Sequence, residues 1–158
     1  MARSYMMAAI AMTTMRFEGS CLCGAVRLRA EEPFLDFLHC HCTDCRKTHG
    51  AAFATSIGVA RERFAVTAGA DEVRAFTAPS GTKRSFCARC GAKIAVENDG
   101  WDAVYVPGSL FDTAFPFKPQ MHMYVRSRAP WYEILDDLPR WEAGPDDDYR
   151  AKLPPMKR

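Results

Sequence analysis

The seven cysteines of this chain stand in three tight groups whose spacing is typical of metal ligands. The groups are a Cys-x-Cys pair, a triplet within six residues and a Cys-x-x-Cys pair: Cys21 and Cys23; Cys40, Cys42 and Cys45; Cys87 and Cys90. Thiols this close along the chain cannot form unstrained disulfides with their neighbours in the same group. The same spacings let two sulfurs bind one zinc ion at about 2.3 Å. The pattern therefore predicts zinc rather than disulfides.

The odd number of thiols indicates two different metal sites. A structural zinc site has four protein ligands, so seven thiolates divide into one closed site and one site of three ligands with an open position. In catalytic zinc sites the open position is where water or substrate binds. The sequence therefore predicts two zinc ions per chain, one of which can do chemistry.

The first and last groups have the geometry of a closed site. In an extended chain, the sulfurs of Cys21 and Cys23 point to the same side because side chains repeat every second residue. Cys87 and Cys90 precede Gly91, as in a zinc knuckle, where a tight turn lets backbone amides donate to the thiolates. We expect these four thiols to close a structural zinc site that contributes directly to folding.

The triplet Cys40, Cys42 and Cys45 then remains for the second zinc. Three histidines lie beside it in the sequence: His39, His41 and His49. In an extended segment the first two alternate away from the thiols, so a histidine ligand is not favoured. We expect the fourth position to accept water or an incoming thiol, whose thiolate form zinc stabilises at neutral pH.

Two other interpretations of the cysteines fit less well. Redox dithiols would need a thioredoxin-like helix after each motif, whereas a strand-like stretch, residues 92–96, follows Cys90. A single zinc ribbon would use the two Cys-x-x-Cys pairs, Cys42 with Cys45 and Cys87 with Cys90. That ribbon leaves three thiols unused, whereas two zinc ions account for every cysteine.

Short strands separated by turns are the elements that must position these ligands. Ten glycines and ten prolines, scattered through the chain, favour a mainly β domain with long connections. One helical turn is expected at residues 43–48, with Thr43 as its cap. The expected strands cover residues 26–30, 51–59, 64–67, 73–77, 82–86, 94–97, 104–106 and 122–124.

Length and charge limit the remaining possibilities. A chain of 158 residues with 48% hydrophobic content suits one domain with an ordinary core. The net charge of +2 gives no strong field for nucleic acid or an anionic membrane surface. No apolar run approaches the roughly 20 residues of a membrane helix, and thiolate sites favour a reducing compartment, so the cytoplasm is predicted. A homodimer is compatible with this composition.

Three segments are expected along the chain. Residues 1–15 are rich in methionine and are interpreted as a flexible leader rather than a secretory signal. Residues 16–143 form the zinc-binding domain. Residues 144–158 are expected to be a C-terminal tail, in which the acidic run 146–148 and the end 152–158 are solvated and frayed.

Three segments that contain these cysteines resemble one known family. Residues 19–24 (GSCLCG), 39–47 (HCHCTDCRK) and 80–91 (SGTKRSFCARCG) are similar to the glutathione-dependent formaldehyde-activating family, which includes centromere protein V. Residues 107–112, His122 and residues 129–139 extend the similarity to roughly residues 17–143. Ala92 departs from the family pattern, which often has Thr there, but it is not a metal ligand.

The resemblance implies a single-domain, β-tent-like fold of small antiparallel sheets around two zinc sites. It assigns Cys21, Cys23, Cys87 and Cys90 to the structural zinc, and it assigns Cys40, Cys42 and Cys45 to the catalytic zinc. It also implies a carbon–sulfur lyase that handles glutathione adducts of small carbonyl compounds such as S-hydroxymethylglutathione, with glutathione as co-substrate. The alternative is a non-catalytic zinc-binding structural or interaction module, because one fold can serve different functions.

A glutathione substrate would need cations near the second zinc, because it carries two carboxylates. The nearest candidates in sequence are Arg46 and Lys47, with Arg84 and Arg89 beside the knuckle. Three residues have the right type for a general acid or base: Asp44, His49 and His122.

Overall fold

Short strands dominate the fold, as the sequence predicts. A computed structural model describes residues 14–144, 146 and 148–157, so the expected leader lies almost wholly outside the described residues. Within them the strands form two sheets. The three-stranded sheet has the order β1 (Arg16–Ser20), β2 (Arg27–Glu31), β5 (Phe64–Ala68).

The eight-stranded sheet carries most of the cysteine-containing segments. Its order is β11 (Arg140–Trp141), β10 (Met121–Met123), β3 (Phe34–Cys40), β4 (Ala54–Ala60), β9 (Ala103–Pro107), β8 (Lys93–Glu97), β7 (Lys83–Cys87), β6 (Val73–Thr77). The helices are α1 (Thr43–His49) and α2 (Tyr149–Lys152), with short 3₁₀ turns η1 (Arg61–Arg63), η2 (Ala70–Glu72), η3 (Gly108–Leu110) and η4 (Val125–Ser127). No described helix has the length and apolar character needed to cross a bilayer.

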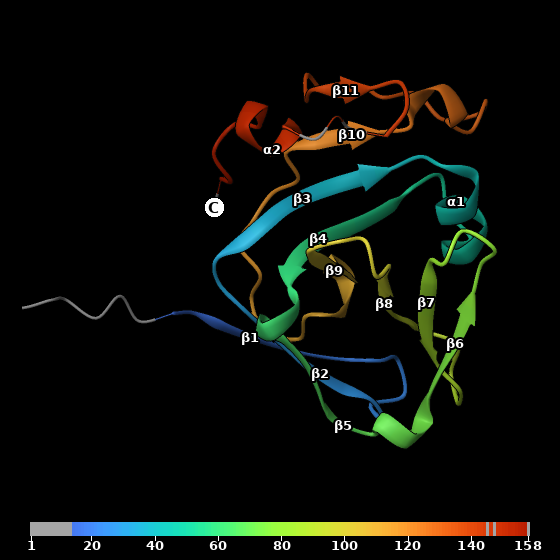
Figure 1. The fold of residues 1–158 in the computed structure, drawn as a ribbon, viewed down its shortest axis with the longest axis vertical. Helices are drawn as coiled ribbons and strands as arrows, with labels where there is room; N and C mark the ends of the chain where they lie inside the picture. The colour runs from blue at the N-terminus through green and yellow to red at the C-terminus, as the bar shows by residue number, and fades with distance from the viewer. Residues whose placement is uncertain (1–13, 145, 147, 158) are drawn as a thin grey trace, which may run out of the picture.

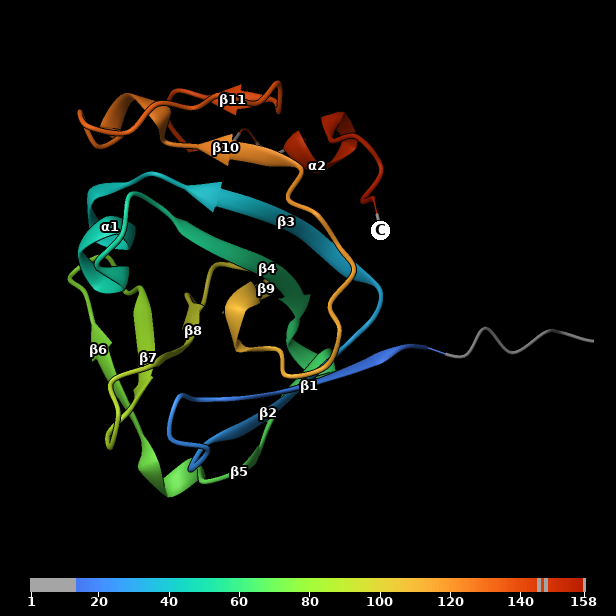
Figure 2. The ribbon, with the colours of Figure 1, turned by 180° about the vertical axis from the view of Figure 1, so that it is seen from behind.

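The core lies between the two sheets. In Figures 1 and 2 the long sheet curves around the middle of the molecule from β3 and β4 to β6 and β7, and the three-stranded sheet closes the remaining side. Leu28 from β2 packs in one cluster with Ile57, Ile94 and Val106 from β4, β8 and β9, and each of these side chains is almost fully buried. Burial of such apolar side chains is the main stabilising term of the fold outside the metal sites.

The mainly β architecture is confirmed, and most expected elements are present within a few residues of their predicted limits. α1 begins at Thr43, but Cys42 rather than Thr43 is its N-cap, and Gly50 ends it in the left-handed conformation at φ 60°. Two features differ from the prediction. β10 pairs in parallel with both β3 and β11 rather than antiparallel, and β1, β3, β11 and α2 were not expected.

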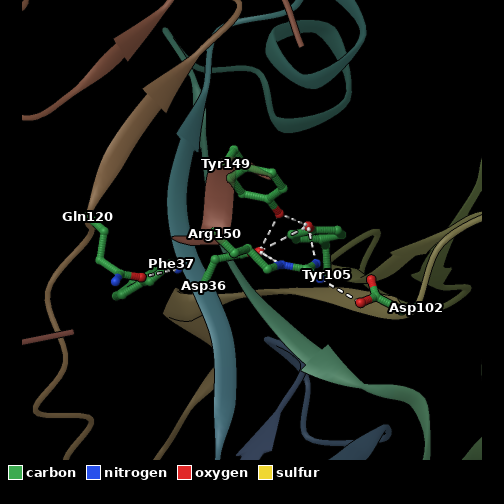
Figure 3. A network of polar contacts seen from close by, with 7 residues as sticks. All are labelled: Asp36, Phe37, Asp102, Tyr105, Gln120, Tyr149 and Arg150. Carbon is green, nitrogen blue, oxygen red and sulfur yellow. Dashed lines mark hydrogen bonds and ion pairs between the residues drawn. The ribbon is translucent and has the colours of Figure 1, made fainter. Parts of the chain in front are cut away.

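The C-terminal segment packs on the sheet at two residues, Tyr149 and Arg150, which lie between the two charged runs that are expected to be solvated. Tyr149 is buried, and its hydroxyl donates a 2.6 Å hydrogen bond to Asp36, a fully buried carboxylate on β3. The Arg150 guanidinium donates to the same oxygen at 3.0 Å, and the Tyr105 hydroxyl donates to it at 3.3 Å (Figure 3). Tyr149 and Arg150 therefore hold this segment against β3, because a buried charge on β3 needs partners.

We expect Arg150→Met to destabilise the protein by about 2–3 kcal/mol, because Asp36 then stays buried without its cation. This loss of unfolding free energy is smaller than for a fully buried ion pair, because the Arg150 side chain is 30% exposed. Urea unfolding of the metal-loaded protein measures the loss. Lys152→Met is the matched control, since its pairs with Asp146 and Asp148 are exposed to solvent and should contribute little to stability. Equal effects of the two substitutions would contradict an anchoring role for Arg150.

Candidate metal centres

Four cysteines from both sheets meet in the first cluster. The Sγ atoms of Cys21, Cys23, Cys87 and Cys90 all lie within 4.8 Å of one another. The Cys21 and Cys23 sulfurs are 3.5 Å apart, and those of Cys23 and Cys87 are 3.8 Å apart. Four ligands placed tetrahedrally at about 2.3 Å from zinc would have sulfurs roughly 3.8 Å apart. The donor set therefore has the dimensions of a four-coordinate zinc site.

Two tight turns hold these thiols in place. The first follows β1, where the Gly24 amide donates to the Cys21 carbonyl at 2.9 Å and the Val26 amide donates to Cys21 Sγ at 3.3 Å. The second follows β7, where the Gly91 amide donates to the Cys87 carbonyl at 2.8 Å. Both glycines have a φ of 73°, which disfavours any side chain. A metal held here would join the two sheets.

The second cluster is built around the start of α1. Cys40 ends β3, Cys42 caps the helix, and Cys45 lies in its first turn, with the three Sγ atoms within 4.8 Å of one another. The Cys45 amide donates to Cys42 Sγ at 3.3 Å. One continuous segment thus brings all three thiols together, as the spacing predicts.

The three thiols of this cluster shift one another's pKa values. Contact first with Cys40 and then with Cys45 lowers the pKa of Cys42 to about 2. Contact with Cys42 raises the pKa of Cys40 to about 12, and contact with Cys40 and Cys42 raises the pKa of Cys45. One thiolate therefore forms readily and the other two thiols stay protonated, unless a cation balances them. Such a donor set fits a divalent metal ion.

The neighbouring histidines are engaged elsewhere. The His39 ring is hydrogen-bonded to the Thr55 hydroxyl, with Nδ1 and Oγ1 2.9 Å apart, and the His41 ring is hydrogen-bonded to His122, with Nε2 and Nδ1 2.8 Å apart. Burial, followed by the charges of His122 and Arg128, lowers the pKa of His41 to about 4, so its ring is neutral at pH 7. Burial also lowers the pKa of His39 to about 4. Within the described chain, the second metal-binding group contains the three cysteines and no histidine.

A hydrogen-bonded line of two buried histidines and an exposed carboxylate runs away from the second cluster. It passes from His41, which stands between two of the thiols in sequence, to His122 and then to both carboxylate oxygens of Asp136, each 3.1 Å from His122 Nε2. The rings of Phe53 and Tyr132 pack against His41. His122, a candidate acid or base by residue type, is thus linked to the cluster through His41, to which it is hydrogen-bonded. Asp136 lies in the segment 129–139 that extends the family resemblance, but its partnership with His122 carried no signal, because a loop Asp next to Asp137 has no distinctive spacing.

The arginines and the lysine that the sequence offers as substrate-binding cations lie in different environments. Arg84 on β7 is buried and donates to Asp44 of α1 at 3.1 Å, so Asp44 is an ion-pair partner rather than a free base. Arg46 lies on α1 with a buried Nε that has no hydrogen-bond partner among the described residues. Arg89 pairs instead with Glu72 at the surface. Lys47 is exposed, and His49 is half-buried, with a pKa lowered by burial and then by Lys93 and Arg84.

Comparison with known proteins agrees with this geometry. The family model for the glutathione-dependent formaldehyde-activating enzyme matches residues 16–127. A protein of Halomonas elongata that bears the provisional name of glutathione-dependent formaldehyde-activating enzyme is 33% identical over 131 residues, which cover 76% of this chain and 82% of that protein. A crystal structure of a Rhodobacter sphaeroides protein has the same fold, with a TM-score of 0.54 and 22% identity over 78% of this chain and 98% of the other. The chain belongs to the glutathione-dependent formaldehyde-activating enzyme family.

Proposed function

We propose that this protein is a zinc-dependent carbon–sulfur lyase that acts on glutathione adducts of small carbonyl compounds, such as S-hydroxymethylglutathione. The observation that carries the proposal is a cluster of three thiols, separate from a complete cluster of four. We assign Cys40, Cys42 and Cys45 to a catalytic zinc. We assign a structural zinc to the other four: Cys21, Cys23, Cys87 and Cys90.

The reaction breaks or forms one carbon–sulfur bond. In the lyase direction the sulfur leaves with the bonding electrons as a thiolate, the hydroxyl of the adduct loses its proton, and the carbonyl compound is released. A zinc ion held by three thiolates would stabilise that leaving thiolate and allow its exchange for another thiol. The guanidinium groups of Arg46 and Arg84 beside α1 would offset the negative charge of the ligands and of the substrate.

We place this activity in the cytoplasm, where thiols stay reduced and glutathione is available. The partner is a small-molecule thiol or its adduct, and a homodimer remains part of the proposal. The reaction is tested by exchange NMR on an equilibrium mixture of glutathione, formaldehyde and their adduct with the zinc-loaded protein. The proposal predicts exchange that exceeds the uncatalysed rate and saturates with glutathione, and no such acceleration with 2-mercaptoethanol. An unchanged exchange rate would instead support the non-catalytic zinc-binding module.

A further inference from the structure

The helix that carries part of the second cluster has no buried side chain. α1 is seven residues long, so no apolar face of it is sunk into the core. Isolated helices shorter than about 12–15 residues are marginal in water, and helices in proteins are normally held by the packing of such a face. Yet Cys42 caps α1 and Cys45 lies in its first turn. The geometry of the second cluster therefore depends on what else fixes α1.

One ion pair joins α1 to the eight-stranded sheet. The Arg84 Nη2 on β7 donates to the Asp44 Oδ2 on α1 at 3.1 Å. Apart from contacts among the thiols themselves, this is the one hydrogen bond or ion pair between a side chain of α1 and another element in the described part of the chain. Asp44 lies between Cys42 and Cys45 in sequence, so the pair acts at the turn of the helix that carries the thiols. Figures 1 and 2 both show α1 beside the start of β7.

Arg84 is the fixed member of this pair. β7 lies between β6 and β8, where Arg84 is opposite Phe76 on one side and Val96 on the other. The Arg84 side chain is only 8% exposed, and its Nε and Nη1 atoms have no hydrogen-bond partner among the described residues. A guanidinium stays charged in a protein, and a buried charge needs a partner of opposite sign. Asp44 is the carboxylate that supplies it.

The same strand connects the pair to the first cluster. β7 ends at Cys87, whose thiol belongs to the group of four. A metal ion bound there would hold the end of β7, and Arg84 would transmit this fixed position to α1. The Asp44 side chain is 61% exposed, so solvent weakens the attraction between the two charges. The pair should therefore matter more for the position of α1 than for the stability of the whole domain.

We propose that Arg84 is a positioning residue for the second metal site, which through Asp44 holds Cys42 and Cys45 where their sulfurs meet that of Cys40. The inference rests on the zinc that the proposed function assigns to this cluster, but not on the lyase reaction. Groups outside the ligand shell that orient metal ligands typically change the metal affinity by about 10–100-fold when they are removed.

The test is the zinc affinity of both sites in the full-length protein, measured by competition with a chromophoric chelator. The wild type should release zinc in two steps, and the weaker step is assigned to the second cluster by its absence in Cys42→Ser. Asp44→Asn and Arg84→Met should each weaken this step by about 10–100-fold and leave the tighter step unchanged. The double variant should be no weaker than the worse single variant, because both substitutions remove the same pair.

Glu72→Gln is the matched control. It removes the carboxylate partner of another arginine, Arg89, which lies beside the first cluster and is exposed at the surface. This substitution should leave the zinc affinity of the weaker step unchanged. Circular dichroism of the zinc-loaded variants should match that of the wild type, because the proposed effect is local to α1.

Two results would overturn the positioning role: a weaker step of wild-type affinity in both single variants, or equal weakening of both steps, which indicates general destabilisation. The exchange assay of the wild-type protein separates this failure from failure of the proposed function. Turnover of the wild type with no effect of the variants on zinc affinity refutes the role of Arg84 and leaves the lyase. A selectively weakened step without wild-type turnover supports Arg84 and refutes the lyase, and a wild type that binds a single zinc ion refutes both.

Discussion

Cys87→Ser is expected to leave the protein unfolded under conditions in which the wild type is folded. Cys87 is fully buried and ends β7, and its thiol meets those of Cys21 and Cys23 from the other sheet. A structural zinc site contributes about 10–16 kcal/mol of apparent binding free energy to folding. The whole stability of a domain is only about 5–15 kcal/mol, so loss of this site exceeds what the remaining core can offset.

Circular dichroism and a proton–nitrogen NMR spectrum measure the loss, and strong chelation of the wild-type metal should reproduce it. The control is Cys45→Ser, the same substitution in the second cluster, which should leave a folded chain. A Cys87→Ser protein with a wild-type urea midpoint would contradict a structural metal between the sheets.

Cys42→Ser is expected to abolish turnover while the fold is kept. The substitution removes one of three ligands from the second cluster, so one of two metal ions should be lost. Serine is a preferred N-cap residue, and position 42 caps α1, so the helix should survive. Loss of the metal should raise the activation free energy by several kcal/mol, which lowers the rate by about three orders of magnitude.

Metal analysis, circular dichroism and the exchange assay together measure these effects. Thr43→Ser, one position further along and not a thiol, is the control and should keep both metal ions and full turnover. A Cys42→Ser protein with two tightly bound metal ions and wild-type exchange would refute the assignment of the second cluster.

The cysteine clusters could be predicted because their geometry is largely local. Two residues separated by one or two others converge wherever the chain is extended or turns tightly, and thiols at that spacing have few other uses. The pairing of Cys21 with Cys87 across the two sheets could also be anticipated, because a complete site needs four ligands. Whether these thiols serve as ligands with the roles assigned here stays a prediction.

Part of the fold could not be anticipated, because the strands that the sequence did not predict lack the usual alternating pattern. β3 is a run of mainly apolar residues with no clear alternation, interrupted by Asp36, whose charge argues against a buried strand until Arg150 and Tyr149 are seen beside it. β11 has only two residues and exists because β10 provides an edge. Such strands depend on tertiary context rather than on local propensity.

The hydrogen-bonded network beside the second cluster was equally hidden from sequence. His41 meets His122 across 81 positions, and Arg140 is placed by a parallel pairing between two very short strands. Parallel partners are not joined by a tight turn, so no local pattern marks them.

Cobalt substitution distinguishes a closed metal site from one that accepts a thiol. The metals per chain are counted, and the thiolate-to-cobalt absorption is followed while glutathione is added. The account predicts two cobalt ions per chain and a saturable spectral change that disappears in Cys42→Ser. Two cobalt ions with no response to glutathione, or the same response in Cys42→Ser, would contradict it.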